Sequence, residues 1–193
     1  VGAPDAERII IAMGSVTDTI TETINTLVKR GEKVGLIKVY LYRPFSVEFL
    51  KSVLPATVKK IAVLDRTKEQ GAREPLFLDV VYALRDLKDL TIIGGRYGLS
   101  SKDTKPSHIN GLFEELKKDS PKEEFTIGIE DDVTNLSIEP VDITVDADYT
   151  SCIFYGLGSD GTVGANKSTV KSTGNNTDLY SQAYFAYDSK KSG

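Results

Sequence analysis

Short apolar runs alternate with helix-period segments over residues 1–118, and this alternation constrains the fold more than any other feature. The apolar runs are 8–13, 33–42, 60–65 and 90–95, and apolar residues recur every three or four positions in 16–28, 46–54, 76–87 and 106–116. Nearly continuous apolar strands are typical of sheets covered on both faces. Because strand–helix alternation favours parallel pairing, we predict a three-layer α/β domain with a mostly parallel sheet over residues 1–120.

Charged residues gather where the third apolar run ends. Asp65, Arg66, Lys68 and Glu69 lie there, and ligands of parallel sheets usually bind at the carboxyl ends of strands. The cluster fits either an anion or substrate pocket or a solvated loop whose charges pair with each other or with a neighbouring domain; surface charge runs usually have the second role. His108 has no partner Cys, Ser or carboxylate pair nearby in sequence. We interpret it as a surface residue and assign no catalytic residue in this chain.

The composition excludes several classes of site. The chain holds one cysteine, Cys152, and one histidine, so it cannot form an internal disulfide and no metal site is expected. A net charge of −4 argues against general nucleic-acid binding, which needs a concentrated basic face. No apolar run approaches the ~20 residues that a membrane helix needs, and the N-terminus shows no secretory signal. We expect a cytoplasmic protein without a membrane segment.

The pattern changes after residue 120. Residues 121–149 are acidic and lack helical spacing, and we interpret them as a linker that runs over a surface, with short extended stretches at 125–129 and 143–145. Residues 150–193 predict a strand at 152–155, a glycine-rich loop, a helix over about 161–171 and a strand at 184–187. A single βαβ unit cannot bury both faces of its sheet. We therefore expect this unit to be incomplete.

The loop of that unit contains Gly156-Leu-Gly158-Ser-Asp-Gly161, a G-x-G-x-x-G sequence. Glycine lets the backbone approach a ligand closely, and the N-terminus of a following helix suits a phosphate. Asp188 could bind the ribose of a dinucleotide, but the adjacent Lys190 and Lys191 favour a ligand with an extra ribose phosphate. A match to the P-loop fails at Asn166, where that motif has a glycine. Glycines used only for packing are the remaining alternative.

Several longer stretches resemble one enzyme family. They are Val39-Tyr-Leu-Tyr-Arg-Pro-Phe45, Lys60-Ile-Ala-Val-Leu-Asp-Arg-Thr-Lys-Glu69, Gly94-Gly-Arg-Tyr-Gly-Leu-Ser-Ser101, Gly156-Leu-Gly-Ser-Asp-Gly-Thr-Val-Gly-Ala-Asn-Lys167 and Tyr184-Phe-Ala-Tyr-Asp-Ser-Lys-Lys-Ser-Gly193. Together they resemble the pyruvate:ferredoxin (flavodoxin) oxidoreductases, of which the chain is similar to an internal slice. By this resemblance, residues 1–120 correspond to a transketolase C-terminal-like domain, and 150–193 to the start of a gamma-type domain.

The resemblance implies a function for the whole protein. The family oxidatively decarboxylates pyruvate on thiamine diphosphate, passes electrons through [4Fe-4S] clusters to ferredoxin or flavodoxin, and transfers the acetyl group to coenzyme A. It implies a homodimer, with the thiamine and cluster domains outside this slice and a contribution of the gamma-type domain to coenzyme A binding. The residues expected to face the phosphates of coenzyme A are Gly158, Ser159, Asp160, Gly161, Thr162, Gly164, Asn166 and Lys167.

Two alternatives to that function stay open. In the first, the slice binds no ligand and is a structural module for contacts between domains. In the second, it is part of a subunit of a related oxoacid or sulfite reductase. The segment Gly71-Ala-Arg-Glu-Pro75 is one residue shorter than the usual family sequence, which puts the local domain contacts near Arg73 in doubt.

Overall fold

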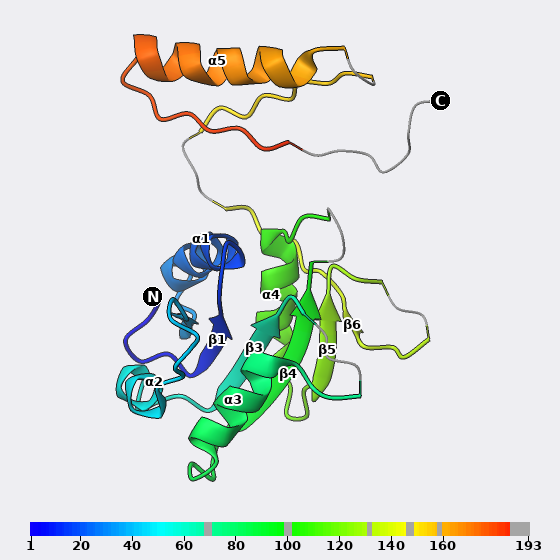
Figure 1. Ribbon diagram of the computed structural model, residues 1–193. Helices are drawn as coiled ribbons and strands as arrows, with labels where there is room; N and C mark the ends of the chain where they lie inside the picture. The colour runs from blue at the N-terminus through cyan, green and yellow to red at the C-terminus, as the bar shows by residue number, and fades with distance from the viewer. Residues whose placement is uncertain (68–70, 99–101, 131–132, 146–148, 158–159, 186–193) are drawn as a thin grey trace. The chain divides into compact units, whose positions relative to one another are not determined.

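The chain folds into two units, which we describe separately (Figure 1). The computed structural model describes residues 1–193 with the exception of 68–70, 99–101, 131–132, 146–148, 158–159 and 186–193. The first unit comprises residues 1–146 and the second comprises residues 147–193.

The first unit contains a six-stranded sheet in the order β2-β1-β3-β4-β5-β6, in which every neighbouring pair is parallel. Its strands are β1 (Arg8–Ala12), β2 (Val34–Lys38), β3 (Lys60–Asp65), β4 (Thr91–Tyr97), β5 (Glu124–Ile127) and β6 (Ser137–Ile138). The α/β class and the parallel sheet predicted from the sequence are confirmed, and the first four strands coincide with the four apolar runs.

Four helices connect the first five strands, and they lie where the spacing of apolar residues predicts them. They are α1 (Val16–Lys29), α2 (Val47–Val53), α3 (Pro75–Leu84) and α4 (Pro106–Glu115). The hydroxyl of Ser46 caps α2 by accepting a hydrogen bond from the Phe49 amide at 3.2 Å. Proline begins both α3 and α4, where its missing N–H and its fixed φ angle favour a helix start.

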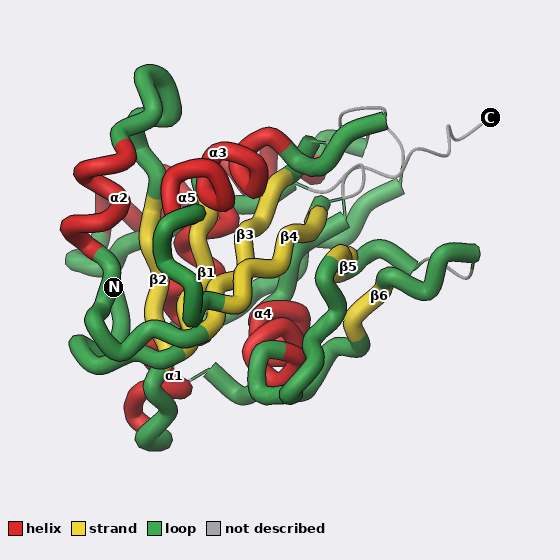
Figure 2. Tube along the Cα trace, turned by 90° about the horizontal axis from the view of Figure 1, so that it is seen from below, coloured by secondary structure: helices red, strands yellow, loops and turns green. Residues whose placement is uncertain are grey.

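Alternate residues of each strand divide the core into two layers. Ile10, Ala62 and Leu64 pack with α1 and α4 on one face, and Ile9 and Val63 pack with α2 and α3 on the other. Figure 2 shows the sheet between these two helix pairs. Both side-chain sets are buried, which explains why the central strands β1 and β3 are apolar at all their inner positions.

A glycine pair in β4 makes room for two aromatic rings. A Cβ atom on Gly94 would overlap the ring of Phe77 from α3, and a Cβ atom on Gly95 would overlap Phe125 of β5. Phe125 is fully buried and Phe77 nearly so. The two glycines of β4 therefore serve packing, because only glycine permits this approach.

The segment expected to be a surface linker contributes to the core instead. Residues 121–146 belong to the first unit, and β5 and β6 extend the sheet with the fully buried side chains of Phe125 and Ile127. Beyond β6 the chain crosses α4, where the Asn110 side-chain amide donates to the Val141 carbonyl at 3.1 Å. The surface-linker interpretation of these residues is wrong, because two short strands complete the face that α4 covers.

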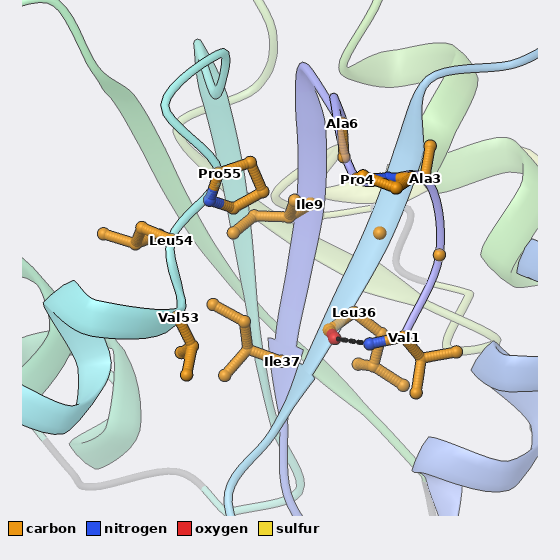
Figure 3. Close-up of a pocket in the computed structure, with 12 residues that line it drawn as sticks. Val1, Ala3, Pro4, Ala6, Ile9, Leu36, Ile37, Val53, Leu54 and Pro55 are labelled. Atoms are coloured by element: carbon orange, nitrogen blue, oxygen red, sulfur yellow. Dashed lines mark hydrogen bonds between the residues drawn. The ribbon is translucent and has the colours of Figure 1, made fainter.

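The N-terminal residues cover the outer edge of β2. The terminal ammonium of Val1 donates to Leu36 O at 3.0 Å, and the Leu36 amide donates to Val1 O at 2.8 Å. The Ala3 amide donates to Val34 O at 3.0 Å. Gly2 forms an antiparallel bridge with Gly35. An apolar hollow of about 250 Å³ lies between this segment, β2 and the end of α2 (Figure 3).

In the second unit the predicted helix forms as α5 (Thr162–Asn176). Residues 152–155, expected to be the first strand, form no strand pairing, and neither do residues 184 and 185 of the second expected strand. The rest of that second strand lies outside the described residues. No residue of α5 is buried. Strands need neighbours to satisfy their backbone groups, and the described part of this unit offers none, so the expected βαβ pairing is not formed.

Candidate functional site

The first candidate site lies at the carboxyl ends of β1 and β3. The strand order reverses at β1, and the crevice at such a reversal is where open α/β sheets usually bind ligands. Asp65 ends β3 there and is only 3% exposed. Its carboxylate accepts hydrogen bonds from the amides of Leu76 at 3.3 Å and Phe77 at 3.2 Å, in the first turn of α3. Asp65 therefore acts as a distant cap of α3.

Burial raises the pKa of the Asp65 carboxyl to about 6, because water no longer solvates its charged form. The two amide hydrogen bonds from α3 act in the opposite direction, and the negative charge of Glu74 adds to the increase. A carboxyl with such a pKa could act in proton transfer. Both of its oxygens, however, already accept hydrogen bonds from the fold.

The charged neighbours of Asp65 are also paired within the fold. Glu74 is 2% exposed and lies 3.4 Å from Arg73 and 3.5 Å from Arg96. Arg73 further donates to the carbonyls of Gly94 and Glu123, at 3.2 and 3.1 Å. These contacts pair charges that α3 and β4 bring to this strand end, and the pairing predicted within the cluster of Asp65, Arg66, Lys68 and Glu69 stays a prediction. Lys68 and Glu69 lie outside the described residues.

His108 has a structural contact. Its Nδ1 accepts a hydrogen bond from the Lys105 amide at 3.1 Å and so caps α4. The ring is half-buried, and a Cβ on Gly128 would lie 3.1 Å from it. Burial and then the positive charge of Lys105 lower the pKa of the imidazole, which favours the neutral form that can accept this bond. His108 is therefore a half-buried helix cap and not a fully exposed side chain.

The second candidate site is the glycine-rich loop that precedes α5. Asp160 accepts hydrogen bonds from the amides of Thr162 at 2.9 Å and Leu157 at 3.1 Å, and also from the Thr162 hydroxyl. These contacts, the hydroxyl first, hold the pKa of the Asp160 carboxyl below its usual value. A Cβ on Gly156 would overlap both Asp160 and Thr162. The loop thus closes around its own carboxylate, and the Thr162 amide is not free for a ligand.

The other residues predicted at this site are spread along the first two turns of α5. Gly161 precedes the helix with a φ of 87°, and the positions of a Cβ on Gly161 or Gly164 are open space. Asn166 and Lys167 follow on the second turn, and the Lys167 ammonium lies 5.7 Å from the ring centroid of Phe185. Gly158 and Ser159 lie outside the described residues. The structure brings Asp160, Gly161 and Thr162 into one turn, with Gly164 next to them.

Among the described residues, no group of three or more His, Cys, Asp or Glu side chains is placed to hold a metal ion. Cys152 is exposed and forms no disulfide. None of the helices in the described part of the chain has the length and apolar character required to cross a bilayer.

Comparison with known proteins gives consistent matches. Residues 6–109 match the family described as pyruvate:ferredoxin oxidoreductase core domain II. The whole chain aligns with pyruvate:ferredoxin oxidoreductase of Moorella thermoacetica at 55% identity and with pyruvate-flavodoxin oxidoreductase of Klebsiella pneumoniae, also at 55%. It spans only 17% of the length of each of these relatives.

Among solved structures, a 2-oxoglutarate:ferredoxin oxidoreductase from Magnetococcus marinus, with 2-oxoglutarate, coenzyme A and succinyl-CoA bound, is similar over 61% of this chain and 18% of its own. The TM-score is 0.44 and the sequence identity is 22%.

Proposed function

The chain belongs to the pyruvate:ferredoxin oxidoreductase family, and from this membership we propose that it is a section of an enzyme that oxidatively decarboxylates pyruvate to acetyl-coenzyme A in the cytoplasm. The electrons would go to ferredoxin or flavodoxin, and the enzyme would be a homodimer. The observation that carries this proposal is the 55% identity with the Moorella enzyme over the complete chain, both units included.

The residues of this section do not fit the redox groups of such an enzyme. A [4Fe-4S] cluster needs about four cysteine ligands, and the chain has one cysteine. We propose that the clusters and thiamine diphosphate are held by other parts of the polypeptide. The first unit would then be a scaffold of the transketolase C-terminal type. Its role as a scaffold agrees with the internal pairing of Asp65, Glu74, Arg73 and Arg96.

The second unit would contribute to coenzyme A binding through its glycine-rich loop and α5, at Gly158, Ser159, Asp160, Gly161, Thr162, Gly164, Asn166 and Lys167. Coenzyme A carries a pyrophosphate and a ribose phosphate, and the open surface at Gly164 with Lys167 on the next turn offers a close backbone approach and a positive charge. The Asp160 carboxylate competes for the same turn. A bound phosphate would therefore have to displace Asp160 or approach from the Gly164 side.

The activity is tested on the full-length protein with its cofactors. Pyruvate-dependent reduction of ferredoxin or flavodoxin that also requires coenzyme A, with acetyl-coenzyme A as product, would support the proposal. A protein that reduces these carriers with a different 2-oxoacid, or that reduces sulfite, and is inactive with pyruvate, belongs to the alternative enzyme classes and would overturn it.

The coenzyme A site is tested separately by calorimetric titration of the full-length protein with coenzyme A and with dephospho-coenzyme A. Lys167→Ala should weaken coenzyme A binding by about 1.5–3 kcal/mol, the size of a charge-assisted hydrogen bond. Lys171→Ala, one helical turn further along α5 and also exposed, is the matched control and should leave the affinity unchanged. Asp160→Asn should strengthen binding, because it removes a like charge. Equal affinities for all variants would favour the alternative that this unit only makes domain contacts.

A further inference from the structure

The two helix layers of the first unit expose opposite kinds of side chain. Along α1 the exposed positions are Asp18, Glu22, Asn25 and Lys29, all polar, as expected for a helix that faces water. The helices α2 and α3 lie on the other side of the sheet (Figure 2). These two helices expose large apolar residues. Of the described residues of α1 and α4, none is an exposed large apolar side chain.

These apolar residues form two ridges, which we call the α2–α3 face. Phe49 and Val53 are four residues apart on α2, 76% and 53% exposed, and Leu78 and Tyr82 are four apart on α3, 46% and 64% exposed. Residues four apart lie on the same side of a helix. Each helix therefore directs a continuous apolar ridge away from the core that its opposite side packs against.

Ion pairs connect the elements that carry the two ridges, and their opposite charges cancel. Arg43, in the loop before α2, lies 2.8 Å from Asp79 of α3, and Lys51 of α2 lies 2.7 Å from Asp86 just after α3. Next to Tyr82, the Arg85 guanidinium stacks 4.1 Å above the ring centroid. The two acid–base pairs leave the face with little net charge to attract a charged partner.

A hollow adjoins these ridges. It lies between the end of α2 and the segment after α3 and has a volume of about 600 Å³. Its lining combines apolar residues, among them Leu54, Val58, Leu87 and Leu90, with the charged residues Lys51, Asp86, Lys88 and Asp89. A hollow beside two apolar ridges can receive an apolar side chain of a partner, the usual centre of a permanent interface. An exposed apolar surface of this kind is uncommon unless something covers it.

We propose that the α2–α3 face is a permanent docking surface for another domain of the same polypeptide. The chain spans 17% of the length of its relatives, so most of the polypeptide lies outside these residues. A tethered domain also meets the face at a high effective concentration. The balanced charges argue against a transient, electrostatically guided partner such as an electron carrier. This inference rests on the proposed section of a longer enzyme, but not on pyruvate chemistry or coenzyme A binding.

The test places a photoreactive benzoylphenylalanine at Tyr82 of the full-length protein, with a matched variant at Asn25 on the polar side of α1. Two isotopically distinct preparations are mixed, so that mass spectrometry separates cross-links within one chain from those between chains. We expect position 82 to cross-link, within its own chain, to residues of the full-length protein that lie outside the 193-residue section. The yield of cross-links from position 25 should be much lower. The cross-link requires no turnover, so enzyme activity is scored independently.

Three results would overturn the proposal. They are the absence of a protein cross-link at position 82, cross-links that join two copies of the chain, and cross-links to another protein such as ferredoxin. Hydroxyl-radical footprinting gives a second measure without substitution. Oxidation of Phe49, Leu78 and Tyr82 in the full-length protein should fall to the level of the fully buried Leu76; oxidation well above that level would contradict a covered face.

Discussion

Replacing Asp65 with asparagine should change how the stability of the first unit depends on pH. Asp65 is buried at the end of β3, and burial raises the pKa of its carboxyl from 3.8 to about 6. The native state therefore binds more protons than the unfolded chain between these two values. It follows that the contribution of this group to stability falls as the pH rises from about 4 to about 6.

The magnitude follows from the difference between the two pKa values. A difference of one pH unit corresponds to 1.36 kcal/mol, so the contribution of Asp65 changes by roughly 2–3 kcal/mol over this window. Asparagine does not titrate, and it keeps one oxygen acceptor for the Leu76 and Phe77 amides. The stability advantage of Asp65→Asn over the wild type should thus shrink by roughly 2–3 kcal/mol between about pH 7.5 and about pH 4.

Urea unfolding of the 193-residue chain, followed by circular dichroism over this pH range, measures the difference, and the carboxyl carbon shift of Asp65 gives its pKa by NMR. Asp86→Asn is the matched control. Its pairing with Lys51 lowers the pKa of Asp86, so its small effect should have the opposite sign, with stability lost as the pH falls. A stability difference for Asp65→Asn that is independent of pH, or a carboxyl that titrates near 3.8, would refute the reasoning.

Two further substitutions test the packing and the buried charges. Gly94→Ala should destabilise the chain by about 1–3 kcal/mol in urea unfolding, because the added methyl group overlaps Phe77. The control, Gly164→Ala, lies in open space on α5 and should raise helicity without lowering stability. A Gly94→Ala variant as stable as the wild type would contradict the close approach. Glu74→Gln should cost about 3–5 kcal/mol, since it removes the buried carboxylate that pairs with both Arg73 and Arg96 and leaves Arg96 only the more distant Glu124. Equal denaturation midpoints of variant and wild type would show that this buried charge is dispensable.

Most of the first unit could be predicted from sequence because its first four strands lie in nearly continuous apolar runs and its helices have regular apolar spacing. Runs such as Arg8–Ala12 and Lys60–Asp65 are buried on both faces, as expected for strands in the middle layer between two layers of helices. An extended stretch was predicted at 125–129, where β5 lies, but its place in the buried sheet was missed. β6 was not predicted. Both strands are short, four and two residues, and lie among acidic residues. The one available signal was the spacing of Phe125 and Ile127, two residues apart.

The candidate site was only partly predictable. The glycine motif and the helix after it were found, but a motif does not show which group occupies the helix N-terminus. Asp160 does so in this structure, from the position before the N-cap residue Gly161. Its place two residues before Thr162 is the sequence signal that was available, since an aspartate side chain readily accepts a hydrogen bond from the backbone two residues on. The pairing of Glu74 with Arg96 depends on side chains from α3's start and β4, which no local pattern connects.

The pairing of residues 1–3 with β2 bears on how this protein behaves at high concentration. The outermost strand of a sheet offers a row of amide and carbonyl groups to any extended segment that meets it, and self-association through such rows is a common cause of aggregation. Here residues 1–3 of the same chain use that row. A truncated form that starts at Pro4 should therefore precipitate or form oligomers more readily than the longer one, even though its core is intact.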